Sequence, residues 1–413
     1  MSGEPPPADG PRTIAVDYLA RVEGESSLAI RLEGGQAKEV RLSIFEPPRF
    51  FEALLRGRSF REAPDITARI CGICPVAYLM SACAAMEDAL GIRVDERIRA
   101  LRRLLYCGEW IESHALHVFL LHAPDFLGYP DAISMARDHR DLVQKGLAIK
   151  KAGNAIVARL GGREIHPVNV RVGGFYRAPP RAELSELAPD LRRAGDDARA
   201  CLAAMAKFPF PDLDRDYELV AVQHPDEYPI LGDRVVSSRG LDIEARGYDD
   251  HFVEEHVPWS TALRSMIRAR GSYLCGPLSR FNLSFDRLLP EVQEAARAAG
   301  LSPPCRNPFR SLLVRLVEIL QAIEESLRII EGYEPPARPF VEPDAIRAGT
   351  GHGVTEAPRG LLYHRYTIDA EGTILDAKIV PPTSQNQRAI EEDSGRARPI
   401  PRRLAARRGD RAR

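Results

Sequence analysis

The chain has 413 residues, with 57 lysines and arginines against 58 aspartates and glutamates, and a formal net charge of −1. A charge this close to zero excludes a general electrostatic attraction to nucleic acid or to anionic membranes. No apolar run reaches the length that crosses a bilayer. The seven cysteines are few for this length and odd in number, which argues against a secreted, disulfide-based scaffold. We therefore expect a cytoplasmic globular protein with a large core.

The N-terminal part predicts a leader followed by a β-hairpin. Residues 1–12 are proline-rich and lack the apolar segment of a signal peptide, so we expect a disordered leader there. Hydrophobic residues then alternate with polar ones over residues 13–45, on both sides of Glu33-Gly34-Gly35. Alternation around a glycine turn is typical of a hairpin.

Helical periodicity dominates from Pro47 onward. It predicts helices over residues 48–57, 76–91, 93–122, 132–160, 180–206, 249–268, 286–299 and 307–332. Within the last of these, residues 312–323 are apolar on most sides, which indicates burial inside a bundle. A second hairpin is predicted from residues 361–368 and 373–380. The expected fold is mainly α (α+β), a single domain over residues 13–393 whose helical-bundle core carries an N-terminal and a small C-terminal β-hairpin.

The sequence changes character after residue 393. The last twenty residues hold eight arginines, one acidic residue and no aromatic residue. Such a charged block is typical of disordered segments. Arginine, alanine, glycine and proline are also what a GC-rich reading frame gives out of phase. We interpret residues 394–413 as an aberrant arginine-rich tail that arose by frameshift or truncation.

Cys71 and Cys74 are the only two cysteines that stand three residues apart. Two thiolates at this spacing can bind one soft metal ion from a single turn, and Gly72 between them allows a tight bend. A lone CxxC supplies half of a metal site. From spacing alone, a dithiol redox pair or two buried structural cysteines remain alternatives.

Five segments, in order along the chain, resemble the large subunit of nickel-iron hydrogenases. Residues 67–91 resemble the first metal-binding segment of that family, with the CxxC near its start. The other four are residues 21–25 (an RxEG motif), 51–58 (a short acidic helix), 353–364 (with an EAPRG motif) and 380–386. The likeness runs from about residue 13 to residue 393. It is greatest to the soluble cytoplasmic branch, which couples to NAD(P) through partner subunits.

The resemblance implies heterolytic oxidation of dihydrogen, or the reverse reaction, at a centre of nickel and iron whose iron carries carbon monoxide and cyanide. Cys71 would be a terminal nickel ligand, and Cys74 would bridge nickel and iron. Glu23 resembles the glutamate that passes protons away from the centre, a role that suits a carboxyl whose pKa is raised by burial.

Four further residues take roles from the same resemblance. Glu52 resembles a carboxylate ligand of a magnesium ion or a similar hard cation. Pro358 and Arg359 resemble the canopy above the metals, where a desolvated guanidinium can accept a proton transiently. Thr383, or otherwise Ser384, resembles the hydroxyl that donates to an iron-bound cyanide.

The sequence departs from the family's cysteine pattern in one respect that affects the whole interpretation. The family takes two more cysteines from a C-terminal DPCxxCxxH segment, and this chain has no second CxxC. Three hypotheses follow: a catalytic large subunit with a damaged end, a truncated non-catalytic scaffold of the same fold, or an unrelated thiol-redox or zinc protein. The expected partners are a small subunit with iron-sulfur clusters, diaphorase-type NAD(P)-binding subunits and hydrogenase maturation proteins.

Two other patterns are interpreted as structural. His114, His117 and His122 lie in one predicted helix with no acid or thiol beside them, which favours core histidines over a metal site. The glycine run at residues 349–353 is not followed by a helix, so we expect no nucleotide site on this chain.

Overall fold

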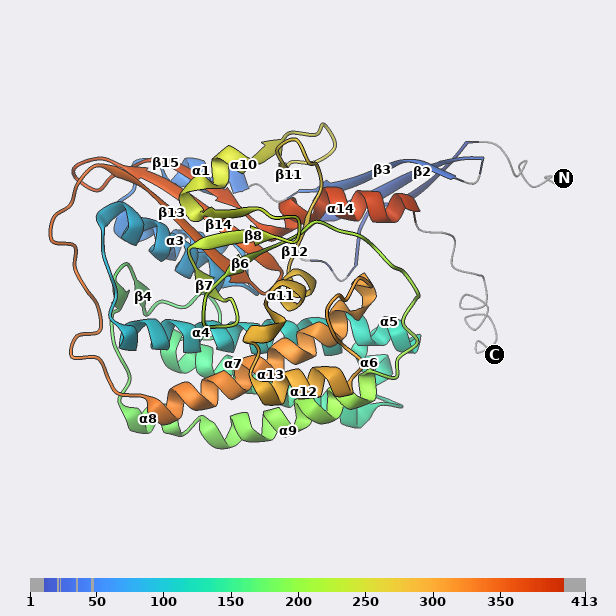
Figure 1. Cartoon of the computed structure of the whole chain (residues 1–413), viewed down its shortest axis with the longest axis horizontal. Coiled ribbons are helices and arrows are strands. Elements are labelled where there is room, and N and C mark those ends of the chain that lie inside the picture. Colours follow the sequence, from blue (N-terminus) through green and yellow to red (C-terminus); the bar gives the residue numbers. More distant parts are fainter. Residues whose placement is uncertain (1–10, 21, 23, 35, 46–47, 397–413) are drawn as a thin grey trace, which may run out of the picture.

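The structure, a computed structural model, describes residues 11–20, 22, 24–34, 36–45 and 48–396. Its long helices α4, α7, α9 and α13 lie together in one layer, and strands β13 to β15 with helix α3 lie in a second layer above them (Figure 1). Among the helices of the described residues, none has both the length and the apolarity needed to cross a bilayer.

The helices are α1 (Pro48–Leu55), α2 (Ala63–Thr67), α3 (Pro75–Leu90), α4 (Glu96–Ala115), α5 (Ala123–Leu127), α6 (Ala132–Met135), α7 (Arg140–Gly161), α8 (Arg181–Ser185), α9 (Ala188–Met205), α10 (Tyr248–His251), α11 (Pro277–Ser284), α12 (Pro290–Ala298), α13 (Ser311–Gly332) and α14 (Pro382–Arg396). A π-helix, η3 (Leu116–His122), continues α4.

The strands are β1 (Arg12–Val16), β2 (Ser26–Glu33), β3 (Gln36–Ile44), β4 (Val170–Arg171), β5 (Gly174–Phe175), β6 (Leu219–Gln223), β7 (Leu231–Gly232), β8 (Arg234–Ser237), β9 (Asp242–Glu244), β10 (Phe252–Glu255), β11 (Arg264–Ile267), β12 (Leu274–Cys275), β13 (Gly349–Ala357), β14 (Gly360–Ile368) and β15 (Ile374–Val380).

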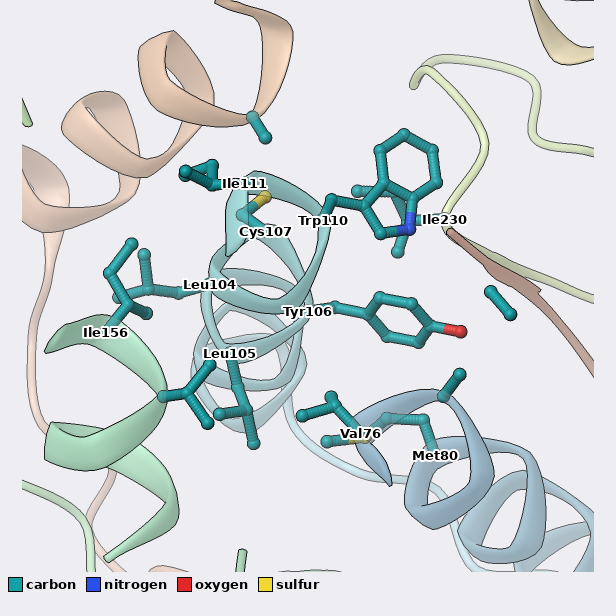
Figure 2. Close-up of a cluster of buried hydrophobic side chains, with 14 of the residues drawn as sticks. Val76, Met80, Leu104, Leu105, Tyr106, Cys107, Trp110, Ile111, Ile156 and Ile230 are labelled. Carbon is teal, nitrogen blue, oxygen red and sulfur yellow. The ribbon is translucent and has the colours of Figure 1, made fainter. Parts of the chain in front are cut away.

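Helix α4 is the centre of the bundle. Its Tyr106 and Trp110 point to one side, toward Ile230, while Leu104 points to the side where Ile156 of α7 lies (Figure 2). Gly108 allows α7 to come close, because a Cβ there would lie 2.9 Å from the Cβ of Ile156. The two helices therefore pack at the density of a protein interior, with no room for an added methyl group.

The glycine run at residues 349–353 belongs to strand β13 and has a packing role. Helix α3 lies against this strand: a Cβ on Gly351 would come within 2.0 Å of the carbonyl oxygen of Ala85, and one on Gly353 within 2.5 Å of that of Ser81. Glycine is needed here because helix and strand approach each other backbone to backbone.

Both predicted hairpins are present, and each is part of a larger sheet. Strands β2 and β3 pair antiparallel, and β1 adds a third strand. Strands β14 and β15 pair as expected within a four-stranded sheet of order β15-β14-β13-β7. A second four-stranded sheet, β12-β6-β8-β9, was not predicted. Its strands are short and separated by loops, so each shows too few alternations to be recognised from sequence.

The prediction of a helix over residues 249–268 was wrong. Only α10 is helical there, and the antiparallel pair β10 and β11 follows. Pro258 lies between the two strands and prevents a continuous helix. The predicted helix over residues 132–160 is broken between α6 and α7, and α12 and α13 begin four residues later than predicted, at Pro290 and Ser311.

Strand β3 and helix α14 are joined by side-chain to backbone hydrogen bonds. The amide of Leu42 donates to Glu391 Oε1 over 3.0 Å, and Gln387 Nε2 donates to the carbonyl of Leu42 over 2.8 Å. Because α14 continues to Arg396, residues 394–396 of the expected tail are helical, which corrects that prediction. The leader up to residue 10 and the rest of the tail lie outside the described residues.

Candidate active site

Cys71 and Cys74 lie at the entrance to helix α3. Cys71 has an extended backbone, Cys74 directly precedes the helix, and Pro75 is its first residue, where a fixed φ suits a helix start. Gly72 is exposed with no other atom within 4 Å of its added Cβ position. The two sulfur atoms are joined as a disulfide, with the Cα atoms 5.5 Å apart. The spacing therefore brings both sulfurs to one point, and reduction is required before either can bind a metal as a thiolate.

A buried carboxylate on α4 holds this entrance in place. Glu109 accepts hydrogen bonds from the backbone amides of Val76 (2.5 Å) and Ala77 (3.1 Å), in the first turn of α3. These amides have no partner within the helix, and an anion at a helix N-terminus is favourable. The sequence analysis missed Glu109. Its signal was an acid inside the otherwise apolar stretch from Tyr106 to Ile111.

The next residue of α4 connects the cysteines to the segment that contains Arg359. Trp110 donates from Nε1 to the backbone carbonyl of Glu356 over 2.9 Å. Glu109 and Trp110 are adjacent, so one turn of α4 contacts both the start of α3 and the end of β13. Pro358 and Arg359 follow directly after that strand.

Arg280 of α11 lies at the centre of a buried network of ion pairs. It is fully buried, and its guanidinium lies 4.3 Å from the ring of Trp110. Its Nε and Nη2 atoms donate to the two oxygens of Glu318, each over 2.8 Å, and its Nη1 atom donates to Glu356 over 2.7 Å. A guanidinium that binds two carboxylates in this way is a strong, charge-assisted arrangement.

The same guanidinium binds the backbone ahead of Arg359. Nη1 also donates to the carbonyl of Ala357 over 2.9 Å, and Nη2 to that of Pro358 over 3.1 Å. With these two bonds, all five N–H donors of Arg280 are used. Arg280 therefore fixes both the charge balance and the backbone path of the segment.

The two carboxyls of the network titrate in opposite directions. Burial alone would raise the pKa of Glu318, but the charge and hydrogen bonds of Arg280 outweigh burial and lower it to about 2. At Glu356, burial outweighs the lowering effect of Arg280 and raises the pKa to about 7. His114 meets Glu318 at 2.9 Å, and burial lowers its pKa to about 4. Of the three helix histidines, His114 is the satisfied core residue that we predicted.

Arg359 and Thr383 line one cavity of about 410 Å³, which His117, His122 and Arg315 also line. Ser384, the alternative hydroxyl, is buried and donates to the carbonyl of Pro381 over 2.9 Å. Thr383 is therefore the hydroxyl that shares a cavity with Arg359. Within the described residues, the lining of this cavity does not include Cys71 or Cys74.

Glu52 is buried on α1 and already carries hydrogen bonds on both oxygens. Its Oε1 accepts from the amide of Ile379 over 2.8 Å, and its Oε2 accepts from Arg49 over 2.7 Å. Arg49 also binds Glu254 over 3.0 Å, so two buried carboxylates share one arginine. Burial raises the pKa of both carboxyls. A hard cation at Glu52 has to displace Arg49. Glu23 lies outside the described residues.

Comparison with known proteins settles the family. The family model for nickel-dependent hydrogenases matches residues 49–145, which include the CxxC. Sulfhydrogenase 2 subunit alpha of Pyrococcus furiosus is 35% identical, over 92% of this chain and 89% of that protein. The chain belongs to the nickel-dependent hydrogenase family. The NAD-reducing hydrogenase HoxS subunit beta of Cupriavidus necator is 27% identical, over 92% of this chain and 86% of that protein.

Solved structures agree with this assignment. A crystal structure of an NAD⁺-reducing [NiFe]-hydrogenase in the H2-reduced state superposes with a TM-score of 0.80 at 27% identity, covering 92% of this chain and 91% of that chain. A [NiFeSe]-hydrogenase from Dm. baculatum, at 20% identity and a TM-score of 0.71, shares the fold. This hydrogenase chain is therefore a large subunit of a family of oxidoreductases acting on hydrogen, and the hypothesis of an unrelated thiol-redox or zinc protein is wrong.

A nickel-iron centre needs soft sulfur ligands that converge on one point. Cys71 and Cys74 fit as a pair of converging sulfur ligands. Across the residues that the structure describes, no group of three or more histidine, cysteine, aspartate or glutamate side chains is placed to hold a metal ion. The described residues thus supply half of a four-sulfur site.

Proposed function

We propose that this chain is the large subunit of a nickel-iron hydrogenase that oxidises dihydrogen to protons and electrons, or runs the reverse reaction. The observation that carries the proposal is the convergence of Cys71 and Cys74 at the start of α3, inside the segment that matches the family. A nickel-iron centre, when bound, supplies the cleavage of dihydrogen. Cys71 would hold nickel, and Cys74 would bridge nickel and iron.

Around that centre we assign roles to four residues. Pro358 shields the site, and Arg359, whose guanidinium lines a half-open and largely apolar cavity, acts as a transient proton acceptor after giving up a proton of its own. Thr383, which lines the same cavity, donates a hydrogen bond to a ligand of the iron. Glu23 passes protons away from the site.

The partner subunits follow from the relatives. The likeness to an NAD-reducing hydrogenase supports a small subunit with iron-sulfur clusters and a diaphorase-type subunit that binds NAD(P). We also propose that maturation proteins load the metals, that the assembly is cytoplasmic, and that Glu52 binds a hard cation, such as magnesium, when Arg49 moves aside.

A second candidate function is a non-catalytic scaffold of the same fold. It is favoured by the lack of a metal-binding group of three or more side chains among the described residues.

Metal analysis and hydrogen–deuterium exchange distinguish the two candidates. The chain with the printed sequence should bind little nickel, because two thiolates leave half of the site to water. A variant in which residues 394–413 are replaced by a family-type segment ending in DPCxxCxxH should bind nickel and iron when co-expressed with maturation proteins. If that variant folds but binds no nickel, the scaffold is the correct function.

Cysteine variants of the repaired chain add a matched control. Cys74→Ser should abolish the metal centre, because a hydroxyl is too weakly acidic and too hard to bridge the two metals. Cys201→Ser changes a buried cysteine of α9, on the opposite side of the bundle, and should leave metal content unchanged. Equal metal content in the two variants would contradict the assignment of Cys74.

A further inference from the structure

The cavity beside Arg359 is lined by both apolar and cationic side chains. Leu42 and Ile44 of β3 and Leu278 of α11 are among its apolar residues. Arg315 and Arg359 add two guanidiniums to the lining. Among the described residues that line the cavity, none is an aspartate or a glutamate. The site therefore brings two positive charges together in a half-open, largely apolar cavity.

The π-helix η3 directs two histidines to this cavity. In an α-helix, residues five apart lie roughly 140° apart around the axis, so their side chains diverge. The wider turn of η3 instead brings His117 and His122 to the same side, with ring centroids 4.0 Å apart, and both line the cavity. Short π-helical segments occur frequently at functional sites.

Arg315 has no counter-ion within the described part of the chain. Its one described hydrogen bond is a long one, from Nη1 to the carbonyl of Ser311, four residues earlier on the same helix, at 3.3 Å. The nearest acid along α13, Glu318, is already bound by Arg280, His114 and Tyr228. Burial and then the charge of Arg359 lower the pKa of Arg315 to about 9. A half-buried guanidinium that no carboxylate of the described residues contacts can gain a counter-charge from an anionic ligand.

His117 adds a second unsatisfied group. Its Nδ1 atom is buried and makes no hydrogen bond to any described residue. Burial, followed by the charge of Arg315, lowers its pKa, so the imidazole is neutral. No described lining residue is a carboxylate, and burial raises the pKa of the Cys275 thiol, so the cationic surroundings disfavour a metal ion here and favour an anion.

We propose that this cavity binds a small carboxylate with a short hydrocarbon body, with Arg315 and His117 as its polar contacts. The planar fork of a guanidinium matches the two oxygens of a carboxylate. The apolar wall formed by Leu42, Ile44 and Leu278 accommodates the hydrocarbon part. The proposal does not rest on hydrogen chemistry, since the binding is measured on the metal-free chain.

Titration calorimetry on the full, metal-free chain tests the proposal with acetate, butyrate and sulfate as probes. We expect butyrate to bind more tightly than acetate or sulfate, because it alone joins a carboxylate to a hydrocarbon chain long enough to contact the apolar lining residues. Arg315→Met should weaken butyrate binding by about tenfold or more, the effect of losing a charge-assisted hydrogen bond. Arg310→Met removes an exposed arginine five residues earlier and should change nothing. No butyrate binding, or unchanged binding in Arg315→Met, would overturn the proposal. Sulfate binding as tight as butyrate would overturn the carboxylate assignment.

Thermal unfolding of the same variants gives an independent measure. Without ligand, Arg315→Met should unfold at a higher temperature than the parent, because it removes a half-buried positive charge that is repelled by Arg359 and contacted by no described carboxylate. Butyrate should raise the unfolding temperature of the parent and of Arg310→Met only. A lower unfolding temperature for ligand-free Arg315→Met, or failure to fold, would show that Arg315 has a structural partner and would refute the proposal.

Discussion

The Nη2 atom of Arg280 donates a hydrogen bond to the backbone carbonyl of Pro358 over 3.1 Å, immediately before Arg359. The position of the proposed catalytic guanidinium thus depends on a second arginine, which lies on α11 and takes no part in lining the cavity among the described residues. Glu318 and Glu356 in turn hold Arg280. Stability and the geometry of the active site are therefore linked through one side chain.

Removing Arg280 should be costly. In Arg280→Met, Glu318 loses its counter-charge and Glu356 is left buried beside it, which should lower the free energy of unfolding by about 3–5 kcal/mol. Arg280→Lys keeps the positive charge but loses the planar guanidinium that binds both carboxylates. It should therefore lower the free energy of unfolding by less than Arg280→Met does. Urea denaturation measures both, with the exposed Arg310→Met as the control. A near-neutral Arg280→Met would mean that the network does not stabilise the fold.

Whether a feature of this site was predictable depends on how far apart in the sequence its residues lie. The CxxC, the EAPRG motif and the two hairpins are local patterns, and each was predicted from neighbouring residues. The network of Arg280, Glu318 and Glu356 joins residues 38 and 76 positions apart, so no periodicity reveals it. The helix predicted over residues 249–268 is absent because Pro258 interrupts the segment, and β10 and β11 form on either side of it.

Removal of the glycine at the contact between α3 and β13 gives a second prediction. Gly351→Ala places a Cβ 2.0 Å from the carbonyl oxygen of Ala85, so strand and helix must separate. Overpacking of this kind costs about 1–3 kcal/mol of unfolding free energy. Gly332→Ala, whose added Cβ meets no atom within 4 Å, should be neutral or slightly stabilising. Equal stability of the two variants in urea denaturation would contradict the close approach of α3 and β13.

The largely buried carboxyl of Glu112 should make the free energy of unfolding depend on pH. Burial, only partly offset by Lys150 at 3.5 Å, raises its pKa to about 7 from an ordinary value of 4.5. A carboxyl with a raised pKa binds a proton more tightly in the folded state. Its contribution is therefore favourable near pH 4.5 and is lost as the pH rises toward 7, by up to about 3 kcal/mol.

Glu112→Gln tests that dependence, because the amide stays neutral at every pH. The difference in unfolding free energy between variant and parent should grow from pH 5 to pH 7, in favour of the variant. Glu334→Gln, at an exposed carboxylate, is the control and should show no such trend. A difference that stays constant with pH would show that Glu112 is charged in the folded protein throughout.

The cysteines predict a defined pattern of alkylation. In the oxidised folded chain, Cys71 and Cys74 are bonded to each other and the other five cysteines are buried, so alkylation should be slow at every site. Mild reduction should release Cys71 and Cys74 alone, with Cys74 reacting faster because Cys71 is 5% exposed. Peptide mass spectrometry assigns the labels. Rapid labelling of Cys201 in the folded chain would contradict this order.

Arg359→Lys, in the chain repaired with a second cysteine pair, tests the assignment of Arg359. An ammonium cannot reproduce the placement of a planar guanidinium, so hydrogen–deuterium exchange should slow by about 100-fold or more, as expected for loss of a proton acceptor. The metals should remain bound, because their proposed ligands Cys71 and Cys74 are unchanged and Arg280 still holds the backbone at Pro358. Arg61→Lys, at an exposed position, is the control. If Arg359→Lys loses nickel as Cys74→Ser does, Arg359 has a structural role, and its assignment as a proton acceptor is wrong.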